Sequence, residues 1–317
     1  MDQSCMTLSS TQLLPNEMES NKPYRQTTSA LGTTLLYCLD WEEQEHLTLH
    51  VMTGDTTGWS GDVGAQQLFN TISHAILSAH QETHFTYENV DESVGPLVLT
   101  SLDQTPAIEA ACPRLSYNSA TKTFDVYVMP TFTHNCHQAW LNEEVPQMSD
   151  SRFKTPAERS LLNRSTGTSQ YAASQKQPDM SIVPVGQDLP SVAIESGWSE
   201  KFAKLHRDKR LWLVGGAGQV QLVLLVKWTK MPGNRVKGVI ESWDLDPAGN
   251  ERLLQEEIIY PRSQAGSVNQ VIRIARGQLF GTRLPAGQDP NDNYGLFVSN
   301  LRNISSFSLQ FDGFSPA

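Results

Sequence analysis

The segment that decides the fold spans residues 177–228 and reads QPDMSIVPVGQDLPSVAIESGWSEKFAKLHRDKRLWLVGGAGQVQLVLLVKW. Apolar residues alternate over 180–185, and a turn rich in Gly and Pro separates them from the apolar run 191–195, which is typical of two short strands. From Ser199 the apolar spacing becomes helical, and the continuous apolar run 220–226 is typical of a central or parallel strand. The segment therefore predicts a hairpin, then a helix, then a strand.

This hairpin brings two acidic side chains together. Asp179 starts its first strand and Glu195 ends its second, so an antiparallel pairing places both at one end of the sheet. Two neighbouring carboxylates repel each other unless a cation or a proton separates them, and hard oxygen ligands suit Mg²⁺ or Mn²⁺. The spacing alone favours a structural role, in which Asp179 caps a turn after Pro178 and Glu195 marks the end of a strand.

The whole string resembles a known nuclease family. A PD pair, fifteen residues, and then E-x-G in an apolar strand before a helix resemble the PD-(D/E)xK nuclease superfamily, and more narrowly a fungal group related to the bacterial Uma-type restriction-endonuclease-like proteins. Other strings resemble that group in the same order: LSY at 115–117, YVMP at 127–130 followed by His134, VIESW at 239–243 and GQLFGTRLP at 277–285. The resemblance covers roughly residues 110–313.

The resemblance implies an α+β fold with an α/β-type core, in which helices flank a mixed β-sheet of the restriction-endonuclease-like kind. It implies that Asp179, Glu195 and the carbonyl of Ser196 hold Mg²⁺ (or Mn²⁺). A helix that often begins His-Glu in the family supplies a further metal ligand. Asn135 stands at the position of that glutamate, so it is the expected third ligand, although it is uncharged.

The family also places a lysine two residues after the glutamate, where it positions or activates water. Gly197 occupies that position in this chain. Lys201, on the following helix, is the nearest substitute as a catalytic residue, and Lys204 and Lys227 are the next candidates. The alternative is that all three are surface lysines and that catalysis has been lost.

Charge is unevenly distributed along the chain. Residues 1–150 hold 4 Lys/Arg against 19 Asp/Glu, whereas residues 151–317 hold 20 against 15. Nine basic residues fall within 201–237. We expect four of them to bind nucleic acid: Lys204, Arg207, Lys209 and Lys227. We also expect Lys201, Lys204, Arg207 and Lys209 to line one accessible face beside the carboxylates. A helix face that is simply solvated explains the same charges.

Composition predicts the organisation and compartment. Residues 1–28 are polar and predict a disordered tail, residues 29–105 an acidic α+β extension, and residues 106–317 the nuclease-like domain with a loop of low order at 146–177. The four cysteines form no C-x-x-C pair, and no apolar run is long enough for a signal peptide or a membrane span. An intracellular protein of the nucleus or cytoplasm is therefore expected.

Three functions remain open at this stage. The first is a metal-dependent nuclease, with DNA favoured over RNA only by analogy of fold. The second is a catalytically inactive relative that binds nucleic acid through the basic residues of 201–237. The third is a protein-interaction module, in which the acidic half covers those residues.

Overall fold

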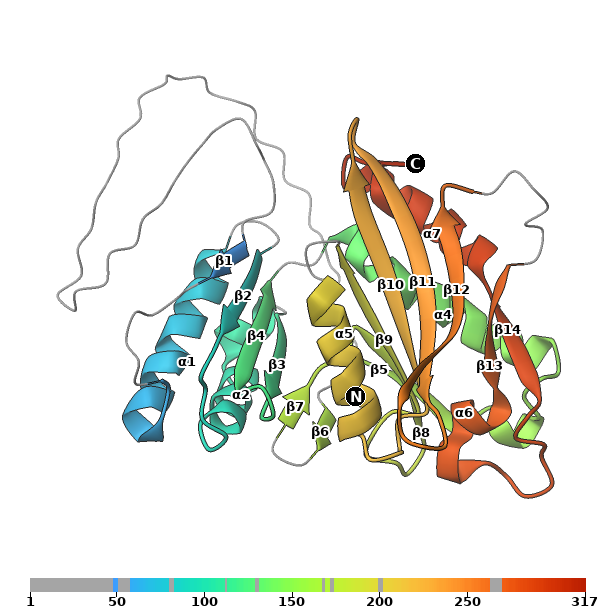
Figure 1. The fold of residues 1–317 in the computed structure, drawn as a ribbon, viewed down its shortest axis with the longest axis horizontal. Coiled ribbons are helices and arrows are strands. Elements are labelled where there is room, and N and C mark those ends of the chain that lie inside the picture. Colours follow the sequence, from blue (N-terminus) through green and yellow to red (C-terminus); the bar gives the residue numbers. More distant parts are fainter. Residues whose placement is uncertain are drawn as a thin grey trace. The chain divides into compact units, whose positions relative to one another are not determined.

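The computed structural model describes residues 48–50, 58–79, 83–111, 113–128, 131–166, 169–171, 174–198, 202–262 and 270–317. Its helices and mixed sheets make an α+β fold (Figure 1), as predicted. The tail predicted over 1–28 lies outside the described residues, and so does Lys201.

The first sheet collects strands from distant parts of the chain. Its spatial order is β1 (Thr48–His50), β2 (Thr83–Tyr87), β4 (Thr123–Val128), β3 (Arg114–Asn118), β7 (Ser174–Lys176) and β6 (Ser169–Tyr171). Three helices accompany these strands: α1 (Gly61–Ser78), α2 (Gly95–Asp103) and α3 (Pro106–Ala110). The apolar faces of these helices and of strands β2, β3 and β4 form one buried cluster, which includes Ile72, Leu99 and Phe124.

The second sheet contains the strands predicted within residues 177–228. Its spatial order is β12 (Glu251–Tyr260), β11 (Arg235–Leu245), β10 (Leu222–Met231), β9 (Val192–Trp198), β8 (Met180–Pro184) and β5 (Leu162–Ser165). β9 and β10 are parallel, whereas the other neighbours in this order are antiparallel. The predicted hairpin of β8 and β9 is therefore confirmed, as is the strand that follows the helix.

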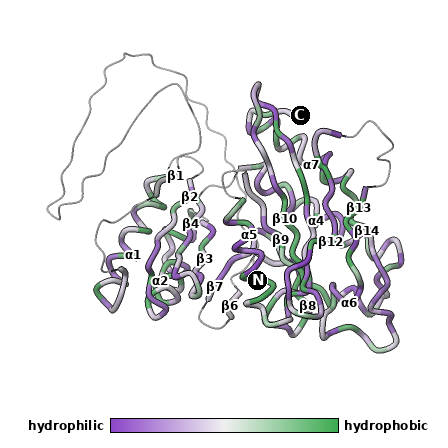
Figure 2. Tube along the Cα trace, viewed as in Figure 1, coloured by the Kyte–Doolittle hydropathy of each residue, from purple (hydrophilic) through white to green (hydrophobic). Residues whose placement is uncertain are grey.

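Helices cover both faces of this sheet. α4 (Phe132–Asp150) and α7 (Val298–Phe311) share one buried cluster with Ile194 and Trp198 of β9. On the other face, α5 (Phe202–Arg210) and the π-helical turn η3 (Leu211–Gly215) pack against Ala193 and Val223. Because β9 and β10 are covered on both sides, they contain the continuous apolar runs 192–194 and 222–226 (Figure 2).

The C-terminal residues add a two-stranded sheet of β13 (Val271–Ala275) and β14 (Asn293–Phe297). Between these strands lie α6 (Arg276–Phe280) and the 3₁₀ turn η4 (Gly281–Arg283). After α7, the short strand β15 (Ser315–Pro316) pairs with the start of β11.

Two expectations about domain organisation are wrong. The boundary placed at residue 105 does not separate two bodies, because β3 and β4 pair with β2 in the first sheet, and residues 46–317 form one compact unit. The predicted loop 146–177 contains the end of α4, the 3₁₀ turn η1 (Pro156–Glu158) and strands β5, β6 and β7. Its polar sequence lacks periodicity, and pairing with strands elsewhere in the chain supplies the order.

Candidate functional site

The two predicted carboxylates lie opposite each other on neighbouring strands. β8 and β9 pair with Met180 across from Ile194, so Asp179, one residue earlier, falls opposite Glu195. The Cβ atoms of such cross-strand pairs lie about 4.5–5.5 Å apart. Both side chains are buried, at 7% and 3% exposure. The juxtaposition predicted from the sequence is therefore present.

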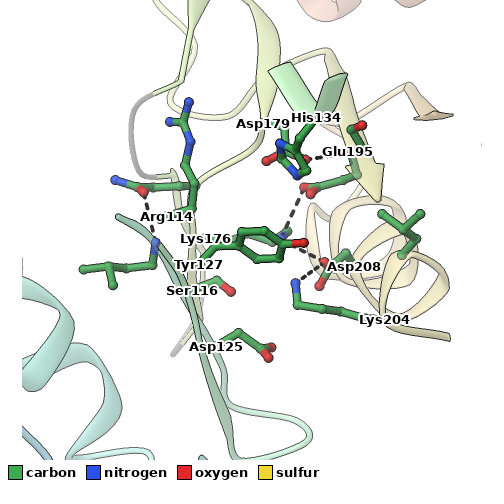
Figure 3. A pocket seen from close by; sticks show the side chains of 14 residues that line it. Arg114, Ser116, Asp125, Tyr127, His134, Lys176, Asp179, Glu195, Lys204 and Asp208 are labelled. Carbon is green, nitrogen blue, oxygen red and sulfur yellow. Dashed lines mark hydrogen bonds and ion pairs between the residues drawn. The ribbon is translucent and has the colours of Figure 1, made fainter. Parts of the chain in front are cut away.

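Both carboxylates line a cavity of about 30 Å³, which has room for a water molecule. The two sheets form opposite walls of this cavity (Figure 3). The first sheet and the residue after it contribute Arg114, Leu115, Ser116, Asp125, Tyr127, Lys176 and Gln177. The second sheet and its helices contribute His134, Asp179, Glu195, Ser196, Lys204, Leu205 and Asp208. The site is thus built by both sheets.

Asp179 is held as a carboxylate by its neighbours. Its Oδ2 accepts a hydrogen bond of 2.7 Å from the backbone N–H of Ser196, and the Nε2 atom of His134 lies 3.6 Å away. Burial alone would raise the pKa of Asp179, but His134, His137 and Arg114 outweigh burial and lower it. Asp179 is therefore the member of the pair whose surroundings favour the charged form.

Glu195 has the opposite tendency. Its Oε1 accepts a 2.6 Å hydrogen bond from the indole N–H of Trp212 and lies 3.3 Å from Nζ of Lys176. Burial raises the pKa of Glu195 to about 8, the charges on Asp179 and Asp208 add to this rise, and Lys176 opposes it. The charge on Glu195 therefore depends on how many cations surround it.

Lys176 and Asp208 are among the members of this site that were not predicted from the sequence. Lys176 is buried, and its Nζ lies 3.2 Å from Oδ2 of Asp208 as well as 3.3 Å from Glu195. Burial would lower the pKa of Lys176, but Asp208 and Glu195 raise it instead. The available signal was a lysine three residues before Asp179, but it fell in the segment predicted to be a loop.

The third expected metal ligand is not in place. Asn135 does not line the cavity; its Oδ1 lies 3.3 Å from Nδ1 of His134 and 3.4 Å from Nε2 of Gln138. The first turn of α4 instead directs His134 to the cavity, since adjacent positions on a helix face different directions.

A divalent cation nevertheless fits the pair of carboxylates. Asp179 Oδ1 and Glu195 Oε2 have no hydrogen-bond partner among the described residues. Within the same residues, no three His, Cys, Asp or Glu side chains gather as a metal-binding group. Mg²⁺ commonly binds to proteins through one or two carboxylates and keeps waters or substrate phosphates as its other ligands. Two free carboxylate oxygens meet that requirement.

Position 197, two residues after Glu195, has little room for a lysine side chain. A Cβ atom at this position would lie 3.2 Å from Cδ1 of Leu205, and that contact is tighter than normal packing. α5 therefore occupies the space that a side chain at position 197 would need. Lys201, the expected substitute, lies outside the described residues. Lys204 lines the cavity, where its Nζ bonds Asp208 at 2.7 Å.

We expect Gly197→Lys to destabilise the fold by about 1–3 kcal/mol, because the new side chain must displace Leu205. In a Leu205→Ala background, Gly197→Lys should cost less unfolding free energy than it does in the wild type. Urea unfolding of the wild type, the two single variants and the double variant measures both effects. A Gly197→Lys protein as stable as the wild type would show that α5 yields without cost.

The basic residues of 201–237 do not form the accessible face that the sequence predicted. Lys209 is buried, with its Nζ 2.7 Å from Oε2 of Glu251 and 3.5 Å from the ring centre of Trp243. Lys227 bonds Oε1 of Glu241 at 2.5 Å. Of the four residues expected to bind nucleic acid, only Arg207 is exposed. Lys204 pairs with Asp208 on its own helix, whereas Lys209 and Lys227 pair with acids distant in sequence, and a charge count cannot anticipate such pairing.

Aromatic rings connect the first sheet to the site. The ring of His84, whose Nε2 lies 2.9 Å from Asp125, stacks on Tyr127 with the ring centres 5.1 Å apart. The ring of His134 lies 5.2 Å beyond Tyr127, and His137 lies 6.1 Å from His134 in an edge contact. The rings link Asp125 in the first sheet to Asp179 in the second.

The last ring in this series predicts a pH effect on stability. Burial lowers the pKa of His137 to about 4, so between pH 6.5 and 4 the folded chain binds fewer protons than the unfolded chain. Stability should therefore fall as the pH falls through this interval, by roughly 3 kcal/mol from this residue. His137→Gln should remove that part of the dependence in urea unfolding at pH 7.5, 5.5 and 4.5. Parallel pH profiles for the two proteins would contradict the prediction.

Comparisons with known proteins add no family. No protein-family model and no curated protein matches the chain. Among the described residues, no helix has the length and apolar character needed to cross a membrane.

Proposed function

We propose that this protein is a metal-dependent nuclease that hydrolyses phosphodiester bonds, with DNA as the favoured substrate. The observation that carries the proposal is the pair Asp179 and Glu195, which are buried at opposite positions of adjacent strands and line one shared polar cavity, each with one oxygen that makes no hydrogen bond among the described residues. The mixed sheet with helices on both faces agrees with the fold that the resemblance implies.

In this proposal, Asp179 and Glu195 would hold Mg²⁺ or Mn²⁺. The metal would supply Lewis-acid polarisation of a phosphodiester oxygen and a bound water of lowered pKa. His134 and the Ser196 N–H fix the orientation of the Asp179 carboxylate, and the Trp212 indole fixes that of Glu195. Arg114 lines the same cavity and provides a cation for a phosphate. The predicted role of the Ser196 carbonyl as a ligand stays a prediction.

A catalytically inactive nucleic-acid-binding or protein-interaction module is the second candidate. The observation that favours it is the charge balance of the cavity, in which Lys176 and Lys204 already neutralise Glu195 and Asp208. The cavity also has room only for water, so a phosphodiester reaches the carboxylates only if the two walls separate.

Cleavage of supercoiled plasmid DNA tests the proposal. We expect the wild-type protein to nick DNA with Mg²⁺ or Mn²⁺ and to stop when EDTA is added. Asp179→Asn should remove this activity, whereas Asp246→Asn, which changes a turn acid outside the cavity, should preserve it. Absence of metal-dependent cleavage of both DNA and RNA would reject the nuclease and leave the inactive module.

A further inference from the structure

Lys176 reaches the site from the first sheet, whereas Glu195 belongs to the second sheet. It is the last residue of β7, whose pairing with β3 makes it part of the first sheet. Its side chain is buried, and Figure 3 shows its ammonium group between the carboxylates of Glu195 and Asp208. A buried ammonium group requires charged or hydrogen-bonding partners, and these two acids provide them across the boundary between the sheets.

The two acids depend on Lys176 to different degrees. Asp208 has a second cation, because Nζ of Lys204 lies 2.7 Å from its Oδ2. For Glu195, Lys176 is the one cationic group within 4.0 Å among the described residues. Loss of the Lys176 charge would therefore leave Glu195 with the Trp212 hydrogen bond but no cation within 4.0 Å among the described residues, whereas Asp208 would keep Lys204.

We propose that Lys176 is the resident cation of this pocket: it neutralises Glu195 in the metal-free protein and competes with a divalent metal for that carboxylate. The second half of this statement rests on the proposed function. The first sheet thereby becomes part of the site, because it delivers a positive charge where Leu205 leaves little room for a side chain at position 197. Lys176 is a positioning residue, since it acts through Glu195.

The first half is tested by thermal unfolding without metal at pH 9, where Glu195 is ionised. We expect Lys176→Met to lower the Tm and Glu195→Gln in the same chain to recover most of the loss. Asp208→Asn in the Lys176→Met chain should recover nothing, because it deprives Lys204 of its partner. Lys176→Arg, which keeps a cation, should stay close to the wild type.

Lys227→Met is the matched control, since this lysine also pairs with a buried glutamate, Glu241, but lies outside the cavity. Adding Glu195→Gln should recover none of the Tm that Lys227→Met loses. If Lys176→Met does not fold, Lys176→Met/Glu195→Gln should still fold. Three results would overturn the assignment: equal recovery of Tm by Asp208→Asn and by Glu195→Gln, failure of Lys176→Met/Glu195→Gln to fold, or purely additive losses of Tm.

The second half is tested by adding Mn²⁺ to the same proteins. A lysine ammonium beside the metal repels it, so Mn²⁺ should bind the Lys176→Met protein at least about tenfold more tightly and raise its Tm more than that of the wild type. Equal shifts in both proteins would overturn the competition. If Mn²⁺ shifts neither protein while Glu195→Gln still recovers the Lys176→Met loss, the metal-dependent function fails and the resident cation stands.

Discussion

Glu195→Gln is expected to lower metal-dependent DNA cleavage at least about a hundredfold, because it removes one of the two carboxylates available to hold a cation. The amide keeps the shape of the side chain and can still accept the Trp212 hydrogen bond. Rates of plasmid nicking at saturating Mn²⁺ measure the change. Glu241→Gln, which alters a buried glutamate outside the cavity, should leave cleavage within about threefold.

The same variant should show no loss of stability without metal. The pKa of Glu195 is raised to about 8 in the folded chain, so the folded state binds more protons than the unfolded state between pH 4.5 and 8. The stability that this proton provides is present below pH 4.5 and is lost as the pH rises through 8. Glu195→Gln should therefore gain stability relative to the wild type as the pH increases over that interval.

Thermal unfolding with and without Mn²⁺ completes the test. Stabilisation by Mn²⁺ in the wild type that disappears in Glu195→Gln would support a metal at this carboxylate. Retained cleavage together with a loss of stability at every pH would instead identify Glu195 as a structural residue at the end of its strand.

Arg276→Met is expected to cost about 3–5 kcal/mol of unfolding free energy, the largest stability effect we expect. The guanidinium of Arg276 is 4% exposed and bonds both oxygens of the fully buried Glu158 at 2.7 and 2.6 Å. Its Nη2 also donates to the carbonyl of Phe153. Removal of the arginine leaves a buried carboxylate without its counter-ion, with the Thr155 backbone N–H still donating to Oε2 at 2.7 Å, and releases η1 from α6.

Urea unfolding at neutral pH measures this loss, and Glu158→Gln in the same chain provides the control. The double variant should recover much of the stability, because no buried charge remains unpaired. Arg276 overcomes the effect of burial and lowers the pKa of Glu158, so its contribution is present above the unfolded value of 4.5 and is lost as the pH falls through the folded value. A loss below about 1 kcal/mol for Arg276→Met would mean that water reaches Glu158.

Much of the second sheet was predictable from local patterns. The alternation in 180–185 and the apolar run 191–195 indicate paired strands because side chains of a strand alternate between its faces. The continuous run 220–226 indicates a strand covered on both sides, which α4 and α5 provide. Pairing of β8 with β9 then places Asp179 opposite Glu195, so the central pair of the site also follows from the sequence.

The rest of the site depends on contacts between residues far apart in the chain. Lys176 contributes only because β7 pairs with β3 in the first sheet. Lys209 and Lys227 leave the surface because Glu251 and Glu241 face them from other strands. His134 lines the cavity in place of Asn135 because adjacent positions on α4 face different directions. Charge counts and motif spacing carry no information about such pairings.

By itself, the sequence determined the hairpin, helix and strand around 177–228, the α+β class, and the meeting of Asp179 with Glu195, because these follow from side-chain periodicity and from pairing between neighbouring strands. Only the tertiary structure decided which lysine serves the pocket, which acids are neutralised, and that the first sheet forms one of its walls. The physical reason is that a buried charge is stabilised by whichever opposite charge the fold brings within about 4 Å, however distant that partner is in sequence.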